Sequence, residues 1–98
     1  MLTTMKNWKL VSYTNATWTD VVNEVATVAT LIISNTSASV AITSSIRLSG
    51  GAVIVPPTSI ASNSSVILDI KSLNIVTGES LQAHASAAGI HIVASGAA

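Results

Sequence analysis

Hydrophobic and polar residues alternate in several segments of this chain, so that every second residue there is apolar. The alternation is clearest over residues 40–48, 66–71 and 81–86. A period of two is that of a β-strand, whose successive side chains point to opposite faces, whereas an amphipathic helix would repeat every 3.6 residues. The pattern therefore predicts a β-strand in each of these segments.

The glycine-rich stretch 49–52 separates the first of these strands from another apolar run. Two adjacent glycines can both adopt a positive φ, which a two-residue type I′ hairpin turn requires. Such a turn would place Ile46 opposite Val55 and Leu48 opposite Val53. The two prolines directly after Val55 lack backbone donors, so this second strand is expected to be short and to lie at a sheet edge.

Residues 86–89, Ser-Ala-Ala-Gly, have the length and the final glycine of a four-residue hairpin loop. This loop would join a strand at 81–85 to a last strand at 90–94, and would place His84 directly opposite His91. The two imidazoles would then form a cross-strand pair or a weak metal site. Two ligands fall short of the three or four that a protein zinc site usually has, so no bound metal ion is expected.

The segment 25–33 is apolar on both faces, as in a central strand, and residues 8–13 are expected to form the first strand. The chain then has seven or eight short strands, with turns roughly every 8 to 12 residues. We therefore predict an all-β fold, a small antiparallel β-sandwich of the Ig-like or jelly-roll-like kind. Residues 25–98 are expected to form the sandwich, and residues 1–24 an N-terminal segment that reaches neighbouring subunits as an arm.

The composition agrees with strands and limits the range of functions. Val, Ile and Thr account for 33 of the 98 residues, and β-branched side chains favour strands over helices. Four Lys and Arg residues balance four Asp and Glu residues, so no charged field attracts nucleic acid or an anionic membrane. The uncharged stretch 25–46 is interrupted by polar residues at 34–37, before the run of about 20 apolar residues that a membrane span needs. Neither a membrane span nor a signal peptide is expected.

No catalytic motif is present, neither a nucleophile elbow, nor a phosphate-binding loop, nor a zinc-protease helix. The four carboxylates, Asp20, Glu24, Asp69 and Glu79, are spread over different predicted elements. So few titratable groups offer little for acid–base chemistry. We expect a protein that is not an enzyme and that needs no cofactor.

The aromatic residues Trp8, Tyr13 and Trp18 all lie in the N-terminal fifth of the chain. A tryptophan can anchor an interface, fill a core or stack on a sugar ring. We take the three residues as candidate interface anchors. The alternatives are that one or both tryptophans cap the core, or that they form a sugar-stacking platform.

The low content of charged residues is the most informative property of this sequence. Only 8% of its residues are charged, against about 25% in an ordinary soluble domain. A sheet protein normally uses charges and prolines to keep its edges from pairing with neighbours. A chain so poor in charge is suited to permanent contact with copies of itself or with a larger assembly.

Several turn motifs carry a resemblance to a known family: Asn35–Ser39, Val55–Pro57, Gly78–Gln82, Ala85–Gly89 and Ala94–Gly96. Over residues 25–96 the chain resembles the small β-sandwich virion proteins of tailed bacteriophages. Residues 1–24 fall outside this resemblance.

The resemblance implies a protein without catalytic residues that decorates or cements a capsid shell, or that sits at the neck or tail, often as a trimer or a higher ring. We therefore expect a virion structural protein that binds itself, with a trimer favoured, and binds the major capsid protein or other virion proteins. Capsid decoration is the first expectation. A neck, tail or baseplate accessory role is the alternative, and a glycan-binding module is a further one.

Overall fold

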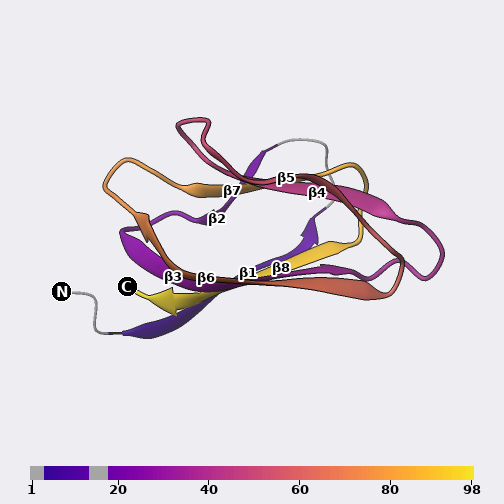
Figure 1. Cartoon of the computed structure of the whole chain (residues 1–98), viewed down its shortest axis with the longest axis horizontal. Helices are drawn as coiled ribbons and strands as arrows, with labels where there is room; N and C mark the ends of the chain where they lie inside the picture. Colours follow the sequence, from indigo (N-terminus) through magenta and orange to yellow (C-terminus); the bar gives the residue numbers. More distant parts are fainter. Residues whose placement is uncertain (1–3, 14–17) are drawn as a thin grey trace.

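The computed structural model describes residues 4–13 and 18–98, with the side chains of residues 11–13 also left out. The described residues form eight strands and no helix, hence no helix able to cross a membrane. The predicted all-β antiparallel sandwich is confirmed (Figure 1). The strands are β1 (Met5–Tyr13), β2 (Thr19–Val22), β3 (Ala26–Asn35), β4 (Ile42–Leu48), β5 (Val53–Ile60), β6 (Ser64–Ile75), β7 (Leu81–Ala85) and β8 (Ile90–Ala97).

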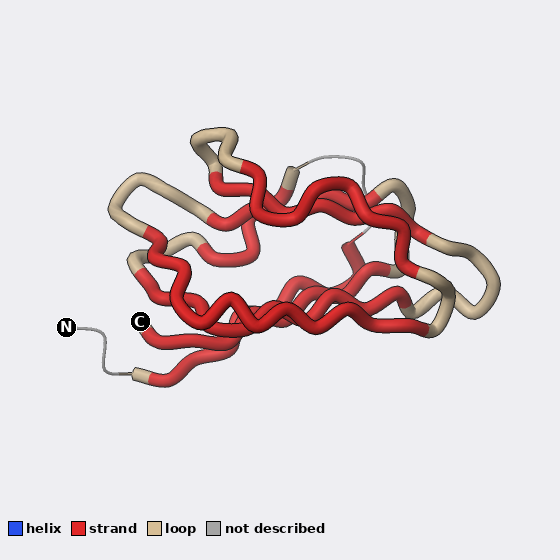
Figure 2. The backbone as a smooth tube through the Cα atoms, viewed as in Figure 1, coloured by secondary structure: helices blue, strands red, loops and turns tan. Residues whose placement is uncertain are grey.

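Two four-stranded sheets form the two layers of the sandwich (Figure 2). In sheet A the strand order is β1-β8-β3-β6, and in sheet B it is β2-β7-β4-β5. Every paired neighbour is antiparallel. The central position expected for residues 25–33 is confirmed, because β3 hydrogen-bonds to β8 on one side and to β6 on the other.

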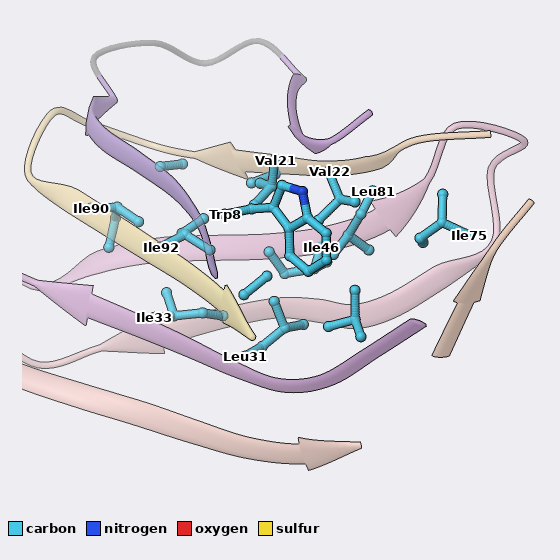
Figure 3. Packing of buried hydrophobic residues seen from close by; sticks show 14 of the residues in the cluster. Trp8, Val21, Val22, Leu31, Ile33, Ile46, Ile75, Leu81, Ile90 and Ile92 are labelled. Atoms are coloured by element: carbon cyan, nitrogen blue, oxygen red, sulfur yellow. The ribbon is translucent and has the colours of Figure 1, made fainter. Parts of the chain in front are cut away.

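The core lies between the sheets and is built by the alternation seen in the sequence. In β7 and β8 each buried residue is followed by a half-buried one, so one face of each strand points inward. Burying an isoleucine or leucine fully is worth about 1.5–3 kcal/mol relative to leaving it exposed. The largest apolar side chains that are fully buried are Leu31, Ile33, Ile42, Ile46, Ile75, Leu81, Ile90 and Ile92, most of which Figure 3 labels.

Asn35 is a buried polar residue at the end of β3, with 2% of its surface exposed. Its side-chain amide donates hydrogen bonds to the carbonyl oxygens of Val40 and Ile60, both at 2.9 Å. Its side-chain oxygen accepts a hydrogen bond from the backbone N–H of Ser37, also at 2.9 Å. These three bonds satisfy a side chain that would be costly to bury unpaired, and they tie the β3–β4 loop to the end of β5.

Gly96 in β8 lies where two strands approach closely. A Cβ atom at this position would stand 1.9 Å from the carbonyl oxygen of Thr27 in β3. No side chain fits at that distance, so the glycine is required by the pairing of β8 with β3.

The predicted turn at residues 49–52 is wrong in type. Of its two glycines only Gly51 has a positive φ, of 102°. The N–H of Gly51 donates to the carbonyl of Leu48, and Leu48 itself pairs with Ala52. This geometry is that of a three-residue loop whose last glycine forms a bulge, so Val53 faces Arg47 instead of Leu48. The predicted pairing of Ile46 with Val55 is confirmed.

Contrary to the prediction, the two prolines do not end β5. β5 does lie at an edge of sheet B, but it continues through Pro56 and Pro57 to Ile60. Between the pairs Ser44–Thr58 and Ile46–Val55 the register shifts, which places both prolines in an irregularity of the ladder. A bulge needs no ladder donor at its extra residue, and a proline is tolerated there.

The hairpin predicted at residues 86–89 does not exist. β7 pairs with β2 and β4 in sheet B, whereas β8 pairs with β1 and β3 in sheet A. The loop therefore crosses from one layer to the other. Its glycine is left-handed as expected, since Gly89 has a φ of 117°.

The predicted boundary at residue 24 does not separate an arm from the sandwich. β1 pairs with β8 over nearly its whole length, from Met5–Ala97 to Tyr13–Ile90. β2 pairs with β7 in the other sheet. Each sheet thus contains one strand from the segment 1–24. β1 covers the edge that β8 would otherwise expose, and β2 covers that of β7.

Candidate functional site

Trp8 belongs to the core and does not stand at the surface. Only 8% of it is exposed, and it packs among the buried residues between the sheets (Figure 3). Its indole N–H donates to a carboxylate oxygen of Glu24 over 2.9 Å. The prediction of Trp8 as an exposed interface anchor is wrong. Its position matches the alternative, a tryptophan that caps the core.

Glu24 follows β2 and holds both Trp8 and Lys6. The ammonium group of Lys6 donates to the same carboxylate oxygen, and it lies 5.8 Å from the centre of the Trp8 ring. The hydrogen bond from Lys6 and, after it, the hydrogen bond from Trp8 lower the pKa of Glu24. Both bonds favour the ionised carboxylate.

Trp18, directly before β2, has a more open position. The guanidinium of Arg47 in β4 lies 4.1 Å from the centre of its ring, within the range of a cation–π contact. The imidazole of His84 in β7 has its centre 5.3 Å from the same ring and is tilted by 46°. Trp18, Arg47 and His84 are all half-buried, so the three side chains form a patch that remains partly open to solvent.

A chain of hydrogen bonds extends this patch along sheet B. Arg47 donates through Nε to the side-chain oxygen of Gln82 over 3.0 Å. Gln82 in turn donates to a carboxylate oxygen of Asp20 over 3.1 Å, and Ser80 donates to that oxygen over 2.9 Å. We call Trp18, Asp20, Arg47, Gln82 and His84 the Trp18 cluster.

The Trp18 cluster lies on the outer face of sheet B. In β7, Leu81, Ala83 and Ala85 are fully buried, so the alternate residues Gln82 and His84 point away from the core. The register places Gln82 opposite both Asp20 in β2 and Arg47 in β4. The cluster is therefore a row of polar side chains across three neighbouring strands, with an indole ring beside it.

The sequence did not single out Arg47, Asp20 or Gln82. Alternation places Arg47 and Gln82 on polar faces, but it says nothing about Asp20 or about which strands are neighbours. The order β2-β7-β4 brings them together from positions far apart in the chain.

The proposed pair of His84 and His91 is wrong. His84 faces Ser45 in sheet B, whereas His91 faces Ser34 in sheet A. The two imidazoles belong to different layers and cannot share a ligand. Within residues 4–13 and 18–98, no group of three or more His, Cys, Asp or Glu side chains could hold a metal ion.

Tyr13, the third predicted anchor, is the last residue of β1 and pairs with Ile90 through its backbone. Its side chain lies outside the described part of the structure. Its role as an anchor stays a prediction.

Two small hollows lie on the described surface, one beside the loop between β6 and β7 and one beside β1. One of about 320 Å³ is lined by residues 23–25 and 76–80, with Val25 and Val76 on its wall. Another of about 190 Å³ is lined by residues 5–7 and 95–96. The first is lined by carboxylates, hydroxyls and an amide beside the two valines, and the second by Met5, the Lys6 ammonium and the polar side chains of Asn7 and Ser95.

Large hydrophobic side chains are exposed at several separate places. They come from strands and loops of both sheets: Met5, Val25, Val40, Val53, Ile67 and Val76. The only salt bridge found among the described residues joins Lys6 to Glu24. The surface is therefore neutral and partly apolar, without a strong charge of either sign.

No protein-family model matches this chain, and no curated protein matches it.

Proposed function

We propose that this protein is a non-enzymatic structural component of a bacteriophage virion, most of all a capsid decoration or cement protein that binds the assembled shell. The observation that carries the proposal is the surface. Among the described residues six large hydrophobic side chains are exposed, and only 8% of the residues of the whole chain are charged. So few charges give no field that attracts nucleic acid, and a weakly charged surface suits repeated contacts between proteins.

The partners in this proposal are copies of the same chain and the proteins of the shell. A repeated interface that carries like charges would be penalised at every copy, and this surface carries few charges. A protein that binds only the assembled shell stabilises it by mass action. The resemblance of the turn motifs to those of phage virion proteins favours the same role. A neck or tail accessory role uses the same surface with fewer copies.

The test is the composition of particles. Virions that encode this chain are purified and their proteins quantified by mass spectrometry. Decoration predicts a copy number close to that of the major capsid protein, and a neck or tail role predicts a far smaller one. Absence of the chain from purified particles would overturn both roles.

A second experiment tests binding to the shell directly. Purified chain is added to shells that lack it, and the heat resistance of the shells is measured. Decoration predicts saturable binding and a higher disruption temperature. Shells that neither bind the chain nor change in stability would contradict a cementing role.

Glycan binding is the second candidate, and the Trp18 cluster is the observation that favours it. Sugar sites combine an aromatic face with a few fixed polar groups, and Asp20, Gln82 and His84 lie beside Trp18. Arg47 already covers one face of the indole, which is why this candidate ranks second. It predicts sugar-dependent quenching of tryptophan fluorescence that Trp18→Phe removes and Trp8→Phe keeps. Lack of quenching by a panel of mono- and oligosaccharides would reject it.

A further inference from the structure

We propose that two copies of this chain pair through the first half of β6, residues 64–70, in antiparallel orientation about a two-fold axis at Ile67. The two A sheets would then form one continuous eight-stranded sheet. This inference does not rest on the virion role, because it concerns the chain in solution.

β6 is a long edge strand with one free side. It pairs with β3 and ends the strand order of sheet A. The outward-pointing N–H and C=O groups of an edge strand form a ready template for another strand. Residues 64–69 keep a regular register against β3, from Asn35–Ser64 to Thr30–Asp69. The edge therefore offers an uninterrupted row of backbone groups over this stretch.

The other three edges carry features that oppose pairing. β5 has Pro56 and Pro57 within an irregular ladder. β1 carries Lys6 and Lys9 and has a register shift near its end. β2 is only four residues long and includes Asp20. Prolines, lysines, bulges and short length are the devices by which proteins block edge-to-edge association.

The first five residues of β6 lack these devices, and Asp69 is the one charge within residues 64–70. Residues 64–68 contain no charge and no proline, and the first irregularity comes after Asp69, where Lys71 has a φ of 63°. Ile67 points outward, and 68% of it is exposed. On the inner face Val66, Leu68 and Ile70 stay half-buried. A strand added at this edge would cover these residues further.

The sequence of this segment complements itself. With the axis at Ile67, this residue meets Ile67 of the other copy, and Val66 meets Leu68. Asp69 then lies opposite Ser65, whose hydroxyl can donate to the carboxylate. Moving the axis to Leu68 would set Ile67 against Asp69, and moving it to Asp69 would oppose two carboxylates, which is destabilising. Only the register at Ile67 buries its exposed side chain against another apolar group.

The expected dimer is weak in isolation. A contact made mainly by one strand lies at the low end of interface sizes. In an assembly, other contacts would hold the copies near each other and raise the effective concentration for this pairing.

The test measures the oligomeric state of the full chain by sedimentation equilibrium and native mass spectrometry over a range of concentrations. The wild type should form a concentration-dependent dimer. Ile67→Lys sets two ammonium groups face to face at the axis and should raise the dimer Kd at least about 100-fold. The matched control is Val53→Lys, because Val53 is 59% exposed on the proline-containing edge of the other sheet. This control should dimerise as the wild type does.

A mixture of variants tests the position of the axis. Ile67→Glu alone and Ile67→Lys alone should be monomeric, and their mixture should form a heterodimer, since opposite charges then meet. Circular dichroism verifies that each variant is folded. A wild type that stays monomeric, or an oligomer that Ile67→Lys leaves intact, would overturn the pairing. Incorporation into virions is a separate readout, so the pairing can fail while the proposed function stands.

Discussion

Trp8 in sheet A donates its indole hydrogen to Glu24, 2.9 Å away, in the segment that follows the first strand of sheet B. Lys6 donates to the same carboxylate oxygen. The N-terminal strands of the two layers are therefore joined at one carboxylate, and this joint is the part of the structure that should respond to pH.

The Glu24→Gln variant should lose less free energy of unfolding between pH 7 and pH 3 than the wild type does. The pKa of Glu24 is lowered in the folded protein, first by the hydrogen bond from Lys6 and then by that from Trp8. A lowered pKa contributes stability that is present above the unfolded value of about 4.3 and is lost as the pH falls through the folded value. Urea unfolding at pH 7 and pH 3 should therefore show a smaller difference in the variant. The control is Asp69→Asn, on an exposed position of β6 away from Lys6 and Trp8. Equal pH dependence in Glu24→Gln and the wild type would refute this role.

Trp8 and Trp18 should differ sharply when each is replaced by alanine. Trp8→Ala removes a buried ring from the core and should lower the free energy of unfolding by about 3–5 kcal/mol. Trp18→Ala loses a half-exposed ring and its contact with Arg47, which is worth about 0.5–1 kcal/mol in exposed positions. Urea denaturation followed by circular dichroism measures both. Similar losses for the two variants would contradict the assignment of Trp8 to the core and Trp18 to the surface.

Asn35→Asp should be strongly destabilising, although it changes a single group of the side chain. The amide that donates to the carbonyls of Val40 and Ile60 becomes an oxygen that faces them. A buried group left unsatisfied costs about 1–3 kcal/mol, and a charged one costs more. The matched control is Asn23→Asp, which adds the same charge at an exposed loop position. Thermal unfolding of the pair checks the prediction, and equal melting temperatures would count against it.

Gly96→Ala should weaken the pairing of β8 with β3. Its Cβ would overlap the carbonyl of Thr27, so the strands must separate locally. Overpacking of this kind costs about 1–3 kcal/mol. Gly50→Ala is the control, because a Cβ there meets nothing within 4 Å and the φ is not positive. Hydrogen exchange of the β3 and β8 amides should be faster only in Gly96→Ala. Slow exchange in that variant would show that the strands accommodate the methyl group.

Which residues of a strand face the core could be predicted from the sequence. In β7 the inward set of Leu81, Ala83 and Ala85 follows directly from the alternation, and Ser44 is buried in the apolar row of β4 as its position in the pattern requires. Ser44 is tolerated there because its hydroxyl donates to the carbonyl of His84. Such predictions depend only on a residue's own strand.

The candidate site could not be predicted in this way, because it depends on which strands are neighbours. A loop of four residues can make a hairpin or cross between layers, and residues 86–89 make the crossing. The interpretation of His84 and His91 as a pair failed for that reason. The residues that His84 does meet are Trp18, directly before β2, and Ser45, opposite it in β4, and both are distant from it in sequence.

By itself, the sequence determined the strand class, the faces of the strands and the small number of charged residues. The first two follow from side-chain shape and from a period of two, which are local, and the third is the composition itself. Only the tertiary structure decided that Trp8 is buried, that Trp18 meets Arg47, and that β6 is left at an open edge. These depend on which sheet each strand joins, and that choice is made by the packing of the whole core.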